Sequence, residues 1–310
     1  MTGPHGFGPW VSEEAAAMFR AEAAMPPASA SDIPTLRMHY DVFNRRHLAT
    51  ALEHYPVEIA EREIAGVTVH SVTPPDIADE GRVLLCLHGG AFMWGAGAGA
   101  LLEAVPVASV AKTRVIAVEY RLAPEHVFPA AVDDVIAVYR ALLETHEAGQ
   151  IGIYGCSAGG ALTAQTVARL IAEGMPLPGA VAMLHGTGLD IGGDSVAASA
   201  MLNGVPVEAN PSDLSAMPYF TGADPHSALV TPGEHPDVLA QFPPSLLVTG
   251  TRDFFSSAVT TMHRRLLAAG ATSQLLDFDG MWHAHHMATA LPESRETFAA
   301  LARWFGTNLA

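Results

Sequence analysis

Three side chains in the second half of the chain have the chemistry of a nucleophile, its base and an acid. Ser157 lies in GCSAGG, Asp253 in TRDFFSS and His283 in DGMWHAHH. A serine hydroxyl is a poor nucleophile at neutral pH unless a base takes its proton, and a histidine base needs an acid to fix its tautomer. The chain order Ser, Asp, His is typical of a serine that follows a strand of a parallel sheet. The pattern therefore predicts covalent catalysis by Ser157.

The residues around Ser157 favour this role. Gly155-x-Ser157-x-Gly159 lies between an apolar run and a helical run, where small neighbours allow the sharp turn that exposes a hydroxyl at a helix N-terminus. The alternative is that Ser157 only caps the helix. Asp253 has the same alternative, as the cap of a helix that begins near Ser256.

Four other side chains compete for the base and acid roles: His285, His286, Asp277 and Asp279. We prefer His283 as the base because it comes first after its predicted strand and follows Gly280. The two competing aspartates precede His283 by only 6 and 4 residues, which places them poorly to reach across to it. Asp253 follows a different predicted strand, so we prefer Asp253 as the acid.

The glycine-rich stretch VLLCLHGGAFMWGAGAGALLEA has two interpretations. Gly95, Gly97 and Ala100 have the spacing of a dinucleotide-binding turn, and Glu119 lies where an acid would bind the ribose. In such a turn the first glycine follows the strand directly, whereas seven residues separate Leu87 from Gly95. We therefore favour an oxyanion hole made of backbone N–H groups after the strand. Its predicted donors are Gly89, Gly90, Ala91 and Ala158.

The elements that must position these residues alternate along the chain. Seven runs are typical of strands: 67–72, 82–87, 114–119, 151–156, 180–185, 245–250 and 273–278. Helical runs occur at 12–24, 129–147, 158–173, 256–269 and 293–308. The central strands are apolar without strict alternation, as burial on both faces requires. We therefore predict an α/β fold with a mostly parallel, doubly wound sheet and helices on both faces.

Two segments interrupt this alternation. We predict an N-terminal cap region over residues 1–55 and a cap insertion over 186–243, which is long and rich in Gly, Pro, Asp and Ser. A connection of that length usually covers a site at the carboxyl ends of the strands. Residues 56–185 and 244–310 would then form the catalytic domain, and we expect the two cap segments to pack together.

Composition excludes several partner classes. The 310 residues carry 32 acidic and 16 basic side chains, a formal charge of -16, which disfavours nucleic acid and anionic membrane surfaces. We expect no membrane span and no secretion signal, hence a cytoplasmic protein. Cys86 and Cys156 are expected to be core thiols, too few for a disulfide framework or a Cys-based zinc site. Because the 15 histidines are scattered, we expect no metal.

These motifs resemble those of the hormone-sensitive-lipase-like (bacterial family IV) esterases of the α/β-hydrolase fold. HGGAF is similar to that family's HGGG-type oxyanion motif, VEYRLAPEHVFPAAVDDV to its DYRLAPE segment, GCSAGG to its GDSAGG elbow and DGMWHAHH to its histidine loop. The match runs from about residue 80 to the C-terminus. The resemblance implies a triad of Ser157, Asp253 and His283, and a cap that shapes the acyl pocket.

Four features depart from the family pattern. Cys156 replaces the elbow's usual Asp, Ala91 replaces the third glycine, and Glu119 replaces the Asp of DYR. The usual DPLxD after the acid's strand is DFFSS here, so a second acidic residue is missing. We interpret Glu119 as structural and expect the other changes to leave the triad intact.

The resemblance implies hydrolysis of short- to medium-chain carboxylic esters, a small-molecule substrate and no cofactor. The same triad would also serve amides, lactones or thioesters, and the scaffold can serve a non-catalytic binding protein. Five apolar or aromatic side chains are candidates for the substrate pocket: Phe92, Trp94, Met217, Phe220 and Trp282. Related esterases often dimerise, which leaves a homodimer open.

Overall fold

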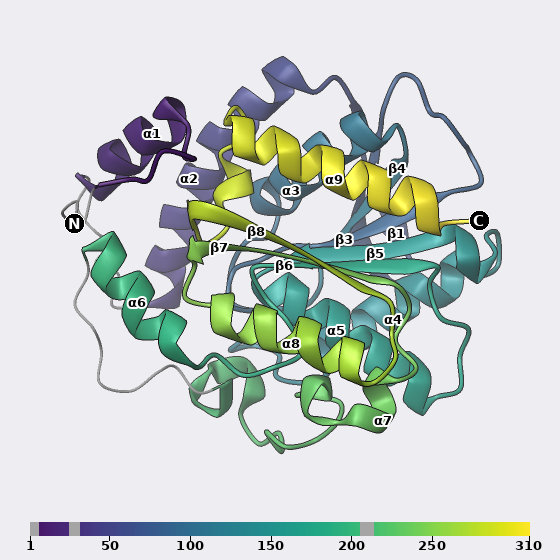
Figure 1. Cartoon of the computed structure of the whole chain (residues 1–310). Helices are drawn as coiled ribbons and strands as arrows, with labels where there is room; N and C mark the ends of the chain where they lie inside the picture. The colour runs from purple at the N-terminus through teal and green to yellow at the C-terminus, as the bar shows by residue number, and fades with distance from the viewer. Residues whose placement is uncertain (1–5, 25–31, 205–213) are drawn as a thin grey trace.

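The computed structural model describes residues 6–24, 32–204 and 214–310, which are built around one eight-stranded sheet (Figure 1). The strand order is β1-β2-β4-β3-β5-β6-β7-β8. The pairs β1/β2 and β2/β4 are antiparallel, and every other pair is parallel. The predicted mostly parallel sheet is therefore confirmed. Its strands are β1 (Glu58–Ile64), β2 (Val67–Thr73), β3 (Val83–Leu87), β4 (Arg114–Val118), β5 (Ile151–Cys156), β6 (Ala180–Leu184), β7 (Ser245–Arg252) and β8 (Ser273–Trp282).

Helices cover both faces of the sheet, as predicted. On one face, α3 (Ala98–Ala111) packs against α9 (Pro292–Asn308), which runs across the front of Figure 1. On the other face lie α4 (Ala130–Leu142), α5 (Ala158–Ala172) and α8 (Ser256–Ala268). Successive residues of β3 enter opposite cores, with Leu85 and Leu87 on the α4–α5 face and Leu84 and Cys86 on the α3–α9 face. Both faces are buried, which is why the strand sequence is uniformly apolar.

Several elements were not predicted from the sequence. Strand β1 reads EIAEREI and lies at the sheet edge, where its side chains are exposed or half-buried and carry no apolar signal. Helix α2 (Ile33–His54) spans 22 residues but has few fully buried side chains. Strand β8 runs four residues past the predicted end at 278, because its pairing with β7 resumes at Trp282 after an irregularity. The extension matters because it delivers His283 directly after the strand.

Helices also form in the two segments predicted to be cap regions. In the N-terminal segment, α1 (Glu13–Ala23) contacts α9 and α2 packs on α3. In the segment 186–243, α6 (Asp194–Asn203) packs on β7 and α8, and α7 (Pro236–Leu239) lies near α8. Residues 1–5, 25–31 and 205–213 of the predicted cap regions lie outside the described residues. Helices α1 and α6 both lie on the left of Figure 1.

A buried arginine links these two segments. Arg252 is 4% exposed and donates through Nη1 to the carbonyl oxygen of Leu202 at 2.8 Å and through Nη2 to that of Gly6. Its guanidinium also lies 4.0 Å from the ring centroid of Phe7. Asn203 returns a hydrogen bond to the Arg252 carbonyl oxygen at 3.1 Å. The end of β7 thus anchors the N-terminal segment and α6 together.

Among the described residues, no helix combines the length and the apolar character that crossing a membrane requires.

The start of α5 lies unusually close to the end of β3. A Cβ atom on Gly159 would be 1.7 Å from the carbonyl oxygen of Leu87, and one on Gly155 would be 2.4 Å from it. The backbone at Leu87 cannot move away from an added Cβ atom as a flexible side chain could, because the interior is closely packed. Both outer glycines of the GCSAG turn are therefore required by the contact between two backbones.

We predict that Gly159→Ala destabilises the protein by at least about 3 kcal/mol, because the added methyl group overpacks a backbone contact. Gly306→Ala is the matched control, since a Cβ atom added to this exposed glycine of α9 would meet no atom within 4 Å outside its own stretch of helix. That change should stabilise the protein by about 0.5–1 kcal/mol, the usual helical gain of alanine over glycine. Urea unfolding monitored by circular dichroism measures both. Equal midpoints for the two variants would contradict the packing argument.

Candidate active site

Ser157 occupies a strained turn between β5 and α5. Its backbone lies at φ 55° and ψ −118°, a conformation that a residue with a Cβ adopts at a cost. The Ser157 N–H donates to the carbonyl oxygen of Leu184 at 2.8 Å, which ties the turn to β6. The hydroxyl makes no capping hydrogen bond with α5, so the interpretation of Ser157 as a helix cap is wrong.

The structure brings Ser157, His283 and Asp253 into one hydrogen-bonded chain. His283 Nε2 lies 3.0 Å from Ser157 Oγ, and His283 Nδ1 lies 2.8 Å from Asp253 Oδ1. Asp253 follows β7 and His283 follows β8, and these strands are neighbours in the sheet. With Nδ1–H donated to the carboxylate, Nε2 can accept the serine proton, which is the arrangement that activates a serine hydroxyl.

The competing residues occupy other places. His285 and His286 are buried and point into the core on the α9 side. Asp279 accepts a hydrogen bond from the Thr251 hydroxyl at 3.4 Å, and Asp277 is exposed on β8. Asp253 also accepts the N–H of Phe255 at 2.9 Å, so it orders the start of α8 as well as His283.

Asp253 is a fully buried carboxylate with four hydrogen-bond donors. Oδ1 accepts from His283 and from the Phe255 N–H, and Oδ2 accepts from His185 Nδ1 at 2.8 Å and from the Thr249 hydroxyl at 2.9 Å. Burial raises the pKa of the Asp253 carboxyl, but His283 and His185 outweigh burial and hold this pKa below its usual range. The acid is therefore ionised at neutral pH.

His185 is a site residue that the motif analysis missed. It follows β6, at the same sheet edge as Asp253 and His283, and its ring is fully buried. Burial lowers the pKa of His185 despite the neighbouring Asp253, so the ring is neutral and donates Nδ1–H to the carboxylate. The available signal was its position at the end of the run AVAMLH. No sequence pattern, however, indicated that His185 would contact Asp253.

Two phenylalanines hold the His283 ring. The Phe254 ring stacks on it with centroids 4.3 Å apart, and the Phe255 centroid lies 5.8 Å away at an interplanar angle of 23°. These are the residues of DFFSS, where the resembling family usually carries DPLxD. The sequence difference from the family pattern therefore places two aromatic rings beside His283. These rings restrict the orientation of its imidazole.

The loop after β3 presents backbone N–H groups toward Ser157. Gly90, Ala91 and Phe92 all have positive φ, and the Met93 and Trp94 N–H groups close the turn on the Gly90 carbonyl oxygen. Within the described part of the chain, the N–H groups of Gly90 and Ala91, like that of Ala158 at the start of α5, have no protein acceptor. These N–H groups are therefore free to donate to a ligand.

Gly89, the fourth predicted donor, does not belong to this set. Its N–H donates to Glu103 Oε1 at 2.7 Å. Glu103 extends from α3 and is 3% exposed. Its buried carboxyl group therefore holds the loop after β3 in place. The sequence analysis missed Glu103 because nothing in the LLEA run marks it as a partner of a residue 14 positions earlier.

Glu119, the acid of the dinucleotide alternative, also has a structural role. Its Oε1 accepts the Gly97 N–H at 2.8 Å and lies 3.1 Å from His70 Nε2. Glu119 therefore anchors the turn that enters α3, which leaves the dinucleotide interpretation without its ribose-binding acid.

A cavity of about 400 Å³ opens above Ser157. Of the five predicted pocket residues, Trp94 and Trp282 line it. Phe92, Met217 and Phe220 are not among the described residues that line it, and this part of the prediction is wrong. Phe92 is 1% exposed and stacks on Tyr219 with centroids 4.2 Å apart, beside Phe220, so these side chains fill the core beneath the loop.

The N-terminal helices α1 and α2 form one side of the cavity wall. One face of α2 supplies residues spaced i, i+3, i+4 and i+7: Tyr40, Phe43, Asn44 and His47. The Tyr40 ring stacks on Trp94 with centroids 4.8 Å apart, which joins α2 to the oxyanion loop. Among the described residues, none from 186–243 lines the cavity, although both cap segments were expected to shape it.

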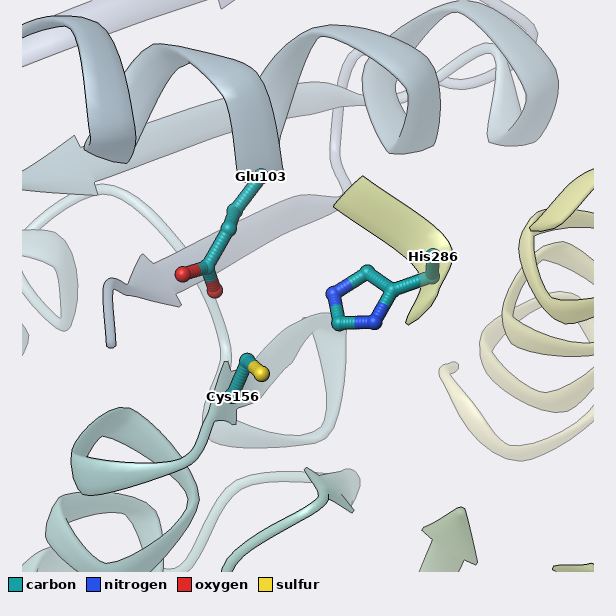
Figure 2. Close-up of side chains that lie close together, drawn as sticks. All are labelled: Glu103, Cys156 and His286. Carbon is teal, nitrogen blue, oxygen red and sulfur yellow. The ribbon is translucent and has the colours of Figure 1, made fainter. Parts of the chain in front are cut away.

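A second polar cluster lies beside the oxyanion loop, where Glu103, Cys156 and His286 converge from separate elements (Figure 2). All three side chains are buried. Burial raises the pKa of Glu103 to about 8, against the opposing hydrogen bonds from the backbone of Gly89 and Cys156. Burial likewise raises the pKa of the Cys156 thiol. In the absence of a ligand these groups are therefore neutral at pH 7.

Known proteins match this architecture. A model of the α/β hydrolase fold matches residues 84–287. An acetyl-hydrolase of Streptomyces hygroscopicus is 30% identical over 232 residues, which cover 74% of this chain and 76% of that protein. The crystal structure of an esterase named E25 has a TM-score of 0.86 at 29% identity and covers 100% of this chain and 98% of its own.

A crystal structure of an esterase from the bacterial hormone-sensitive lipase family has a TM-score of 0.81 at 25% identity, covering 96% of this chain and 98% of its own. These similarities extend beyond residue 80, where the motif resemblance began, into the N-terminal helices. The predicted fold is therefore confirmed over nearly the whole chain.

We predict that acidification destabilises this protein because four histidines are buried uncharged. Burial lowers the pKa of His88, His185, His285 and His286 from the ordinary value of 6.5, so the unfolded chain takes up these protons first as the pH falls. Glu103 acts in the opposite sense, since it is already protonated in the fold. Four protons taken up by the histidines less one already held by Glu103 give a net uptake of about three, so the free energy of unfolding should fall by up to roughly 4 kcal/mol per pH unit well below pH 6.5.

Urea unfolding at several pH values between about 5.5 and 7.5 tests this balance. Glu103→Gln is the informative comparison, because it removes the opposing titration and should steepen the loss of stability with acid. A free energy of unfolding that stays constant across this range would mean that the four buried rings are not neutral in the fold.

Proposed function

The chain belongs to the α/β hydrolase fold family, and we propose that it is a serine carboxylesterase of the hormone-sensitive-lipase-like group. Proteins named as esterases match it in sequence and in structure over most of its length. The observation that carries the proposal is the chain of hydrogen bonds from Ser157 Oγ through His283 to Asp253, opening into a cavity. It is the arrangement that acyl transfer through a serine requires.

In the proposed mechanism, His283 Nε2 takes the Ser157 proton as Oγ attacks the ester carbonyl carbon. Asp253 keeps Nδ1 protonated and stabilises the imidazolium that forms. The tetrahedral intermediate collapses to an acyl-enzyme when His283 protonates the leaving alcohol. Water then attacks the acyl group, with His283 again as the base, and releases the acid.

Backbone N–H groups would stabilise the oxyanion. Gly90, Ala91 and Ala158 are the proposed donors, since the Gly89 N–H is engaged by Glu103. Removing one such donor typically costs about 2.7–4 kcal/mol of transition-state stabilisation. Glu103 would contribute indirectly, because its hydrogen bond holds the loop in the donating conformation before substrate arrives.

The cavity favours a small ester. Its volume of about 400 Å³ lies at the low end of the range of about 300–1,000 Å³ that ligand pockets span. Aromatic side chains from α2 and the oxyanion loop form much of its wall, so we infer an uncharged acyl group of short to medium length. We further propose that α1, α2 and α6 form the cap, held together at Arg252.

Amides, lactones and thioesters remain the alternative substrates for the same triad. A non-catalytic binding protein is the more distant alternative, and the complete Ser157–His283–Asp253 chain argues against it. The experiments that follow separate these functions.

We predict that the purified protein hydrolyses p-nitrophenyl esters with kcat/KM highest for short acyl chains and declining toward palmitate. The physical reason is that the cavity directly above Ser157 has only about 400 Å³, so a long acyl chain would have to extend into the adjoining cavity beside α1 and α2. A chelator should leave turnover unchanged, because no step of the mechanism uses a metal. Turnover of a lactone, thioester or amide but of no ester by the folded protein would instead select one of the alternative substrates.

We predict that Ser157→Ala lowers kcat by on the order of 10⁴-fold or more, because the nucleophile is lost while binding is retained. The fold should persist, with an unchanged urea midpoint, since the serine hydroxyl makes no capping hydrogen bond. Turnover of this variant close to that of the wild type would overturn the mechanism.

A further inference from the structure

Three side chains with metal-ligating atoms converge beside the oxyanion loop, and we propose that Glu103, Cys156 and His286 bind a divalent ion of the zinc class. One oxygen, the thiol sulfur and one ring nitrogen lie within 4.8 Å of one another. They come from α3, the end of β5 and the short helix His285–Met287. Figure 2 shows the three side chains facing a common space between these elements.

Two of the three groups have an unused atom in the buried interior. Glu103 Oε1 accepts the Gly89 N–H, but Oε2 has no partner among the described residues. His286 Nδ1 likewise has none. The exposed fractions of Glu103, Cys156 and His286 are 3%, 1% and 3%. A buried polar atom without a partner costs free energy, which a bound ion would recover.

The set of ligands matches zinc better than other common ions. Thiolate, imidazole and carboxylate are its usual ligands, at about 2.0–2.3 Å, and sites with three protein ligands keep a fourth position for water. A tetrahedral site of this kind separates its ligand atoms by roughly 3.5 Å. Small side-chain rotations would therefore close the cluster around an ion. Magnesium and calcium, which prefer oxygen ligands, fit it poorly.

Charge and protons balance on binding. The ion replaces the proton of the Cys156 thiol and the proton of the Glu103 carboxyl group, while neutral His286 binds through a lone pair. Two protons leave for one divalent ion, and the buried site has the same net charge before and after. This exchange avoids the cost of burying unpaired thiolate and carboxylate charges.

The cluster has an access route and is distinct from the triad. Glu103 and Cys156 line the same cavity as Ser157, so an ion can enter from the substrate side. Within the described part of the chain, the second group of potential metal ligands is His185, Asp253 and His283, which contains no sulfur. A signal from thiolate coordination therefore identifies the proposed site and excludes the triad.

Titration of the reduced, chelator-treated protein with Co²⁺ tests the site without any ester. We expect a thiolate-to-cobalt absorption band in the near ultraviolet with visible bands typical of tetrahedral cobalt, and displacement of both by Zn²⁺. About two protons should be released per ion at pH 7, measured by calorimetry in buffers of different ionisation enthalpy. Binding without the thiolate band, or no binding at all, would overturn the proposal.

The two cysteines of the chain provide a matched pair of variants. Cys156→Ser should abolish the thiolate band, whereas Cys86→Ser, at another buried cysteine, should retain it. Glu103→Gln should weaken Zn²⁺ binding at least about tenfold. This variant keeps an oxygen that can accept the Gly89 N–H, so it provides the test if Cys156→Ser does not fold. A band that survives Cys156→Ser, or unchanged affinity in folded Glu103→Gln, would refute the assignment.

Discussion

The buried negative charge of Asp253 is the constraint on which the site depends. An ionised carboxylate without solvent is tolerated only when hydrogen bonds replace its water. Here the donors come from His185 after β6, Thr249 in β7, Phe255 before α8 and His283 after β8. The charge can therefore be buried only if three neighbouring strands end at the same edge. The same geometry places His283 within hydrogen-bonding distance of Ser157.

The parts of this arrangement that depend on local sequence could be predicted. Apolar runs separated by helical runs were sufficient for the mostly parallel sheet, and the GCSAGG turn identified Ser157 because close backbone approach demands glycines at both flanks. Asp253 and His283 could be chosen because each follows a strand end, and carboxyl ends of parallel strands share one edge. The roles themselves remain predictions until turnover is measured.

Interactions that join distant segments could not be predicted in the same way. Glu103 reaches back to the Gly89 N–H, and His185 reaches Asp253 across 68 residues, without any spacing that would signal either contact. The pocket prediction failed for Phe92 for a related reason, since an aromatic residue after a strand suits a core as well as a cavity. Helix α2 was missed because much of its surface is polar, although one face forms the cavity wall.

The attachment of α6 and the N-terminal segment at Arg252 bears on how the family could diversify. Its guanidinium donates to the carbonyl oxygens of Gly6 and Leu202, which are main-chain atoms that persist when the side chain changes. Mutations in these segments can therefore accumulate without breaking the two hydrogen bonds. Arg252 itself immediately precedes Asp253. The residue that ties these two segments together is thus the chain neighbour of the carboxylate that binds His283, so one strand end fixes both the surrounding segments and the hydrogen-bonded chain to Ser157.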